Sequence, residues 1–130
     1  MNIYLDIDGV LIQKDGKPAD YVSEFLEYIT NNHNVYWLTT HCKGDSNQTV
    51  KYLSNKLPKE CAAFLSKIKP TNWQTLKTEA IDFKQQFVWL DDYIMESEIN
   101  VLKDHKAQIY FIKIDLNKEP GMLKRLKNFI

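Results

Sequence analysis

Short apolar runs alternate with amphipathic stretches along the whole chain. Four runs rich in β-branched and aromatic residues are predicted to be strands: Asn2–Ile7, Val35–Leu38, Phe87–Leu90 and Gln108–Ile114. Elsewhere apolar residues recur at helical spacing, which predicts helices over Tyr21–Thr30, Asn47–Leu57, Trp73–Ile81, Ile94–Lys103 and Met122–Phe129. The stretch Cys61–Ile68 fits either a strand or a helical turn. This order favours an α/β fold: one domain over residues 1–130, built as a three-layer α/β/α sandwich with a mostly parallel central sheet.

Polar side chains close the first three predicted strands. They are Asp6 and Asp8, then Thr39, then Asp91 and Asp92. In an open parallel sheet, ligands bind just beyond the carboxyl ends of the strands, so we expect these groups to share one site. Lys77, in the predicted helix before the third strand, adds an ammonium group. Carboxylates, a hydroxyl and an ammonium together suit a metal ion and a phosphate.

Each of these residues taken alone also has a plain structural interpretation. Asp8 and Gly9 form a common turn pair, and Thr39 and its neighbour fit a turn after a strand. Lys77 fits a solvated helix lysine, and the Asp91–Asp92 pair fits the acidic first turn of a helix. Four such segments in order favour a site over four unrelated features.

The four segments resemble the motifs of the haloacid dehalogenase superfamily of phosphohydrolases, across nearly the whole chain. Asp6-Ile7-Asp8-Gly9-Val10-Leu11 is similar to the first motif, which is the most specific of them. Thr39 corresponds to the second motif, Lys77 to the third, and Leu90-Asp91-Asp92 to the double-acid form of the fourth. The resemblance implies a Mg²⁺-dependent phosphatase or phosphotransferase that works through an aspartyl-phosphate.

The resemblance also implies a role for each residue. Asp6 would be the nucleophile, and Asp8 the general acid and base whose backbone carbonyl also binds Mg²⁺. Thr39 would hold a phosphoryl oxygen, and Lys77 would neutralise charge. Metal ligands would include Asp6, Asp91 and Asp92, and either of the last two could bind the ion directly. An acid at Asp8 favours phosphate chemistry, because relatives that cleave carbon–halogen bonds lack it.

The segments between the motifs are too short for the cap domain of larger relatives, so we expect an open site. Such a site suits a phosphorylated small molecule or a phosphorylated polynucleotide end. The segments Val35–His41 and Asp115–Gly121 resemble small bacterial and phage members, some of which are linked with polynucleotide end processing. A phosphate- or protein-binding module without catalysis is the alternative from another class.

The composition of the chain limits the partners and the compartment that we expect for the protein. Lys and Arg together number 17, as do Asp and Glu, so no net field attracts nucleic acid or membranes. The two cysteines, Cys42 and Cys61, form no disulfide framework or zinc spacing, which favours the cytoplasm. No apolar run could span a membrane, and no signal peptide is apparent. His41 and Cys42 are interpreted as loop residues near the pocket mouth, and the oligomeric state stays open.

Overall fold

The computed structural model describes all residues from 1 to 130 and has a four-stranded, wholly parallel sheet at its centre. The strands are β1 (Asn2–Leu5), β2 (Asn34–Trp37), β3 (Phe87–Asp91) and β4 (Phe111–Lys113), in the spatial order β2-β1-β3-β4. The four predicted strands are confirmed, although the first and the last are shorter than expected. Residues Gln108–Tyr110, expected in the last strand, form a 3-10 turn.

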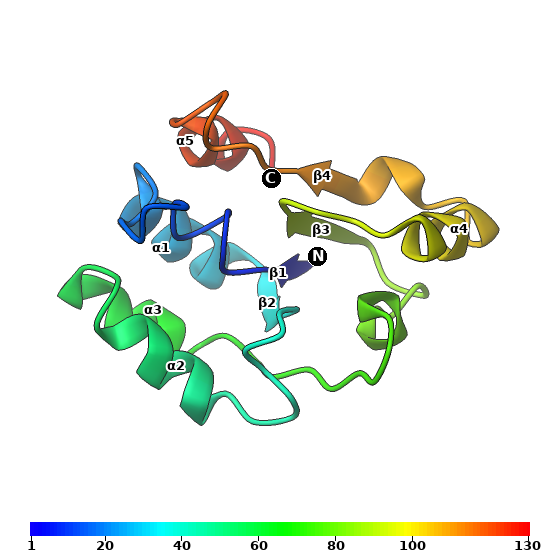
Figure 1. The fold of residues 1–130 in the computed structure, drawn as a ribbon, viewed down its shortest axis with the longest axis horizontal. Helices are drawn as coiled ribbons and strands as arrows, with labels where there is room; N and C mark the ends of the chain where they lie inside the picture. The colour runs from blue at the N-terminus through cyan, green and yellow to red at the C-terminus, as the bar shows by residue number, and fades with distance from the viewer.

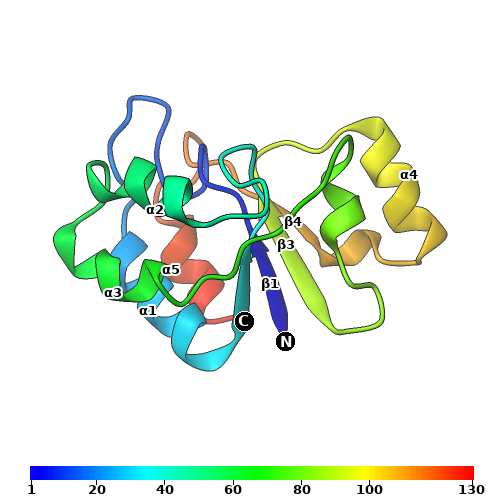
Figure 2. The ribbon, with the colours of Figure 1, turned by 90° about the horizontal axis from the view of Figure 1, so that it is seen from below.

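Helices cover both faces of this sheet, which confirms the predicted three-layer α/β/α fold (Figure 1). On one side lie α1 (Val22–Asn32), α2 (Asn47–Ser54), α3 (Ala62–Leu65) and α5 (Met122–Lys127), and on the other side lies α4 (Glu96–Asp104). Figure 2 shows the same division from below, with the strands between the two groups of helices. None of the helices combines the length and apolar character that crossing a bilayer requires.

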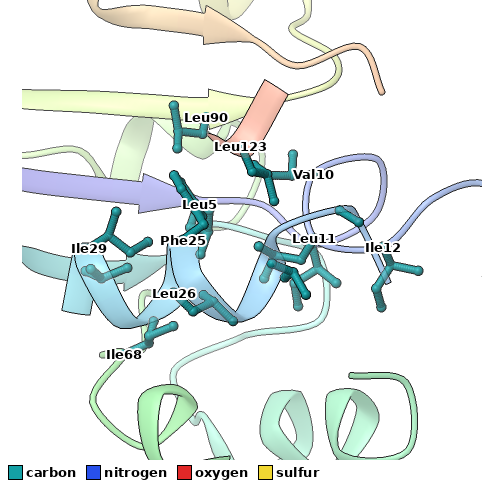
Figure 3. Packing of buried hydrophobic residues seen from close by; sticks show 14 of the residues in the cluster. Leu5, Val10, Leu11, Ile12, Phe25, Leu26, Ile29, Ile68, Leu90 and Leu123 are labelled. Atoms are coloured by element: carbon teal, nitrogen blue, oxygen red, sulfur yellow. The ribbon is translucent and has the colours of Figure 1, made fainter. Parts of the chain in front are cut away.

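Alternation along the strands divides the core into two clusters, one on each face. Ile3 and Leu5 of β1 belong to the larger cluster of 25 buried residues, under α1 and α5. Leu5 lies close to Phe25 in Figure 3. Tyr4 points to the other face and joins Trp89 in a smaller cluster of seven. Successive strand side chains face opposite ways, so two buried faces require the continuous apolar runs seen in the sequence.

The chain between β1 and α1 forms a small flap and carries no inserted domain. Leu11 and Ile12 are buried at its root (Figure 3), where the carbonyl of Leu11 accepts a hydrogen bond from the backbone N–H of Ala19. Its tip, around Lys14, is exposed. No cap domain is therefore inserted here, as the short segments between motifs predict.

The helix predicted over Trp73–Ile81 is wrong. Only Lys77–Ala80 is helical, as a single 3-10 turn, and the residues before it form a loop. The Glu79 carboxylate organises this loop by accepting backbone N–H groups from Gln74, Thr75 and Leu76. A carboxylate that binds the backbone in this way competes with helical hydrogen bonding. The ambiguous stretch after Pro58 is helical, as a 3-10 turn followed by α3.

Candidate active site

Three acidic side chains meet where β1 and β3 end. The two strands pair in parallel with Leu5 opposite Leu90, so the next residues, Asp6 and Asp91, emerge side by side. Asp92 follows at once, and one carboxylate oxygen from each of these three residues lies within 4.8 Å of the other two. Asp6 and Asp91 are 7% and 1% exposed, so their carboxylates are largely removed from water.

Lys77 is the cation of this cluster. Its Nζ lies 2.7 Å from Oδ2 of Asp91 and 3.4 Å from Oδ1 of Asp6, and its side chain is mostly buried. Burial lowers the pKa of Lys77, but the charges of Asp6 and Asp91 outweigh that effect and raise it overall. Lys77 is therefore held as an ammonium between the two carboxylates.

A buried glutamate on the neighbouring helix positions Lys77. Glu98 of α4 is 3% exposed, and its Oε2 accepts the backbone N–H of Lys77 at 2.8 Å. Its other oxygen accepts the N–H of Met95 at 3.0 Å. Glu98 was not anticipated from the sequence. It lies three residues after Met95, the residue that precedes α4, and this spacing of a capping box was the available signal.

The carboxylates outnumber the positive charge available to them. Burial, with the charge of Asp6 adding to it, raises the pKa of Asp91 to about 7, although Lys77 opposes this. Burial likewise raises the pKa of Asp6 against Lys77, and burial followed by Asp91 raises that of Asp92. A divalent cation would relieve this repulsion, and a set of carboxylate oxygens is the donor type that Mg²⁺ prefers. The residues present therefore fit the ion expected from the sequence.

Gly9 allows Asp92 to reach this cluster. Its backbone is left-handed, with φ of +81°, and a Cβ placed there would overlap the Asp92 carboxylate. Glycine is required on both grounds, because other residues disfavour this conformation and any side chain would displace Asp92.

Asp8 lies in the same cleft, but its carboxylate turns away from the three others. Oδ2 of Asp8 lies 2.8 Å from Nε2 of His41, and Oδ1 accepts a hydrogen bond from the Tyr52 hydroxyl at 3.1 Å. The Asp8 side chain is 58% exposed. The structure therefore places the Asp8 side chain at the exposed rim of the cleft and not in the carboxylate cluster. Tyr52 was not anticipated from the sequence. His41, interpreted there as a loop residue, is a direct partner of the Asp8 carboxylate.

The two threonines after β2 differ in burial, since Thr39 is buried and Thr40 is exposed. Thr39 is 1% exposed, and a hydrogen bond from its side chain is one of the influences that lower the pKa of Asp6. Its hydroxyl oxygen also accepts the backbone N–H of His41 at 3.3 Å. Thr40 is exposed and lines the cleft. Cys42 does not line the cleft, because it is fully buried in the larger core cluster.

The cleft over the carboxylates has a volume of about 380 Å³, and both charged and apolar side chains line it. Its larger apolar and aromatic lining residues are Trp73, Tyr93 and Met95. The Trp73 ring is held by Lys43, whose Nζ lies 3.3 Å from the ring centroid. The cleft thus offers both charged and apolar or aromatic contacts to a ligand.

A second hollow of about 340 Å³ adjoins the first: Asp92 lines both, and Gly9 lines the second. Three lysines line it: Lys14 from the flap, and Lys113 and Lys118 from the end of β4 and the loop that follows. None of the three forms an ion pair in the structure. Asp92 and Asp115 also line this hollow, so three lysines outnumber two acidic residues there and the lining has a net positive charge for an anion beside the carboxylate cluster.

Comparisons of this chain with protein-family models, with curated proteins and with solved structures find no match.

Proposed function

We propose that the protein is a Mg²⁺-dependent phosphatase of the haloacid dehalogenase type, hydrolysing a phosphomonoester through an aspartyl-phosphate. One observation carries the proposal. A buried aspartate at the tip of the central strand, Asp6, lies beside an ammonium group and two further carboxylates, at the floor of an open cleft. Phosphoryl transfer depends mainly on positioning and charge neutralisation, and this cluster supports both.

In the proposed reaction, an Asp6 oxygen attacks phosphorus while the ester P–O bond breaks. The leaving oxygen takes a proton from Asp8, so the first product is an alcohol. Water then attacks the aspartyl-phosphate, Asp8 takes the proton of that water, and the products are inorganic phosphate and free Asp6. Lys77 offsets the negative charge of Asp6 and the phosphoryl group throughout. Thr39, whose side chain hydrogen-bonds Asp6, would bind a phosphoryl oxygen.

Asp6, Asp91 and Asp92 would hold the metal ion, together with the backbone carbonyl of Asp8. When bound, Mg²⁺ supplies the charge that lets a carboxylate approach a phosphate dianion. Addition of Mg²⁺ to the metal-free protein should raise its melting temperature, and an Asp91→Asn, Asp92→Asn double variant should lose most of that increase.

Hydrolysis of an aryl phosphate with and without Mg²⁺ tests the proposal. The wild type should turn over only with the metal, and Asp6→Asn should be inactive with an unchanged circular dichroism spectrum. Asp20→Asn, an exposed carboxylate outside the cleft, is the matched control and should retain full activity. Turnover by Asp6→Asn would exclude this nucleophile. Absence of wild-type turnover on a broad phosphate panel, with Mg²⁺ still bound, would favour the binding module instead.

The lysine-lined hollow favours a more specific substrate, a phosphorylated polynucleotide end. A chain that places its terminal phosphate on Asp6 could lay the next phosphate near Lys113 and Lys118. Lys113→Gln with Lys118→Gln should then lower kcat/KM for an end-phosphorylated oligonucleotide and flatten its salt dependence. The same variant should leave a mononucleotide unaffected. Equal rates on oligonucleotide and mononucleotide in the wild type would favour the phosphorylated small molecule.

We also infer a reducing, cytoplasmic setting from the cysteines. Cys42 and Cys61 are both free and both buried, which suits a compartment where thiols are kept reduced.

A further inference from the structure

Asp8 is an exposed carboxylate with both oxygens engaged. Its side chain is 58% exposed and stands on the loop after β1, where nothing buries it in one rotamer. His41 and Tyr52 supply its two partners, one to each oxygen, at 2.8 and 3.1 Å. They come from different segments, since His41 follows β2 and Tyr52 belongs to α2. The carboxylate is therefore oriented by contacts from outside its own loop.

The two partners also restrain each other. The rings of His41 and Tyr52 stack, with centroids 4.1 Å apart and planes inclined by 18°. The carbonyl of His41 accepts a hydrogen bond at 2.8 Å from the hydroxyl of Thr49, a fully buried residue of α2. The loop after β2 and helix α2 are thus joined twice, by this hydrogen bond and by the stack. The pair forms a fixed support and not two independent surface side chains.

We propose that His41 and Tyr52 are positioning residues that hold Asp8 where it protonates the leaving oxygen, an inference that rests on the proposed function. Neither residue touches the reacting atoms. Their contribution is to keep one carboxyl rotamer in place, which an exposed loop aspartate would otherwise share among several. Lys77 and the three clustered carboxylates act on the phosphoryl group, whereas this pair acts on the departing alcohol through Asp8.

This role has a kinetic signature that loss of folding would not produce. A phenolate such as p-nitrophenolate leaves readily without a proton, whereas an alkoxide needs one as the P–O bond breaks. Damage to the acid therefore slows alkyl phosphates far more than aryl phosphates. General acid catalysis contributes about 10²–10⁴-fold, and misplacing the acid should forfeit part of that factor.

The experiment compares p-nitrophenyl phosphate with an alkyl phosphate such as glycerol 1-phosphate, under saturating Mg²⁺. Tyr52→Phe keeps the ring and removes only the hydroxyl, and His41→Leu removes the ring nitrogen. Each should lower kcat/KM on the alkyl ester by about tenfold or more, while kcat/KM on the aryl ester changes less than about threefold. The ratio kcat/KM is used because it reports departure of the alcohol and not the later hydrolysis of the aspartyl-phosphate, which is the same for both esters. His41→Gln, which keeps a side-chain N–H, should recover part of the alkyl activity.

Two references complete the design. Asp8→Asn should show the same selective loss in stronger form, and Tyr28→Phe, whose hydroxyl bonds only the carbonyl of Ile130, should show no loss. Equal losses on both esters, or none, would overturn the positioning role while leaving the phosphatase intact. A wild type inactive on both esters would overturn the proposed function itself, and the positioning role with it.

Discussion

The two acidic regions of the cleft are built in different ways. Asp6 and Asp91 are buried, and one ammonium group from Lys77 holds them together. Asp8 is exposed and is held by hydrogen bonds from two stacked rings. Charges removed from water are costly, whereas exposed charges are screened. Changes in the buried region should therefore alter stability and metal binding as well as turnover, and changes in the exposed region should alter turnover alone.

The largest effect should follow from removing the central cation. Lys77→Met leaves two buried carboxylates without a partner, and loss of one member of a buried ion pair costs about 3–5 kcal/mol. Urea unfolding in EDTA should show that loss at about neutral pH, with Mg²⁺ restoring part of it. The same substitution at the exposed Lys84 is the control. Equal free energies of unfolding for Lys77→Met and Lys84→Met would show that the charges of Asp6, Asp91 and Lys77 are exposed to solvent.

The pH dependence of stability should reflect the protonation of Asp91 in the buried region. The pKa of Asp91 rises from 3.8 to about 7 on folding, so the folded chain binds the extra proton. Stability from this proton is complete below about pH 4 and is lost as the pH rises through about 7, by at most about 1.4 kcal/mol per pH unit.

Thermal unfolding in EDTA should therefore show a falling melting temperature between about pH 5 and about pH 7.5. Saturating Mg²⁺ should remove or reverse the trend, because the ion binds the deprotonated carboxylates. A metal-free melting temperature that rises over this range would contradict the assignment of Asp91 to a buried, negatively charged cluster.

The third comparison is between two glutamates on one helix. Glu98→Gln keeps the shape but can accept only one of the two N–H groups bound by the carboxylate. Leaving a buried donor without a partner costs about 1–3 kcal/mol. Turnover should also fall, because Lys77 loses its backbone anchor. Glu96→Gln changes an exposed residue in the same turn and should match the wild type in both measurements.

The smallest effect separates backbone strain from close approach. Gly9 and Gly16 have nearly equal φ values, +81° and +87°, so alanine strains both by about 1 kcal/mol. Nothing lies within 4 Å of a Cβ at Gly16, whereas at Gly9 it meets Asp92. Gly9→Ala should therefore weaken Mg²⁺ binding in calorimetry, and Gly16→Ala should not. Equal affinities would remove Asp92 from the metal site.

Much of the fold follows from the sequence because the strands are buried on both faces. Runs such as Phe87–Leu90 are apolar throughout, and the acids directly after them mark where the strands end. The helix expected around Lys77 was wrong because periodicity does not register the Glu79 carboxylate, which binds the preceding backbone and fixes a loop.

The division between buried and exposed acids was less predictable. Asp6 and Asp8 lie two residues apart in the segment after β1, and neighbours distant in sequence decide where each side chain points. Tyr52 reaches Asp8 from a helix 44 positions further along the chain. An aromatic residue on an amphipathic helix has the same sequence pattern whether it packs in a core or orients a carboxylate, so composition and spacing could not distinguish these roles.

The position of β1 between β2 and β3 has a consequence for biosynthesis. During synthesis β1 acquires its second neighbour only when residues Phe87–Asp91 have been made. Until then one edge of β1, a strand that carries the apolar residues Ile3 and Leu5, is unpaired. Such an edge readily pairs with other chains. Premature termination or pausing before Phe87 should therefore yield aggregating fragments, and synthesis through Asp91 protects the nascent protein by closing that edge.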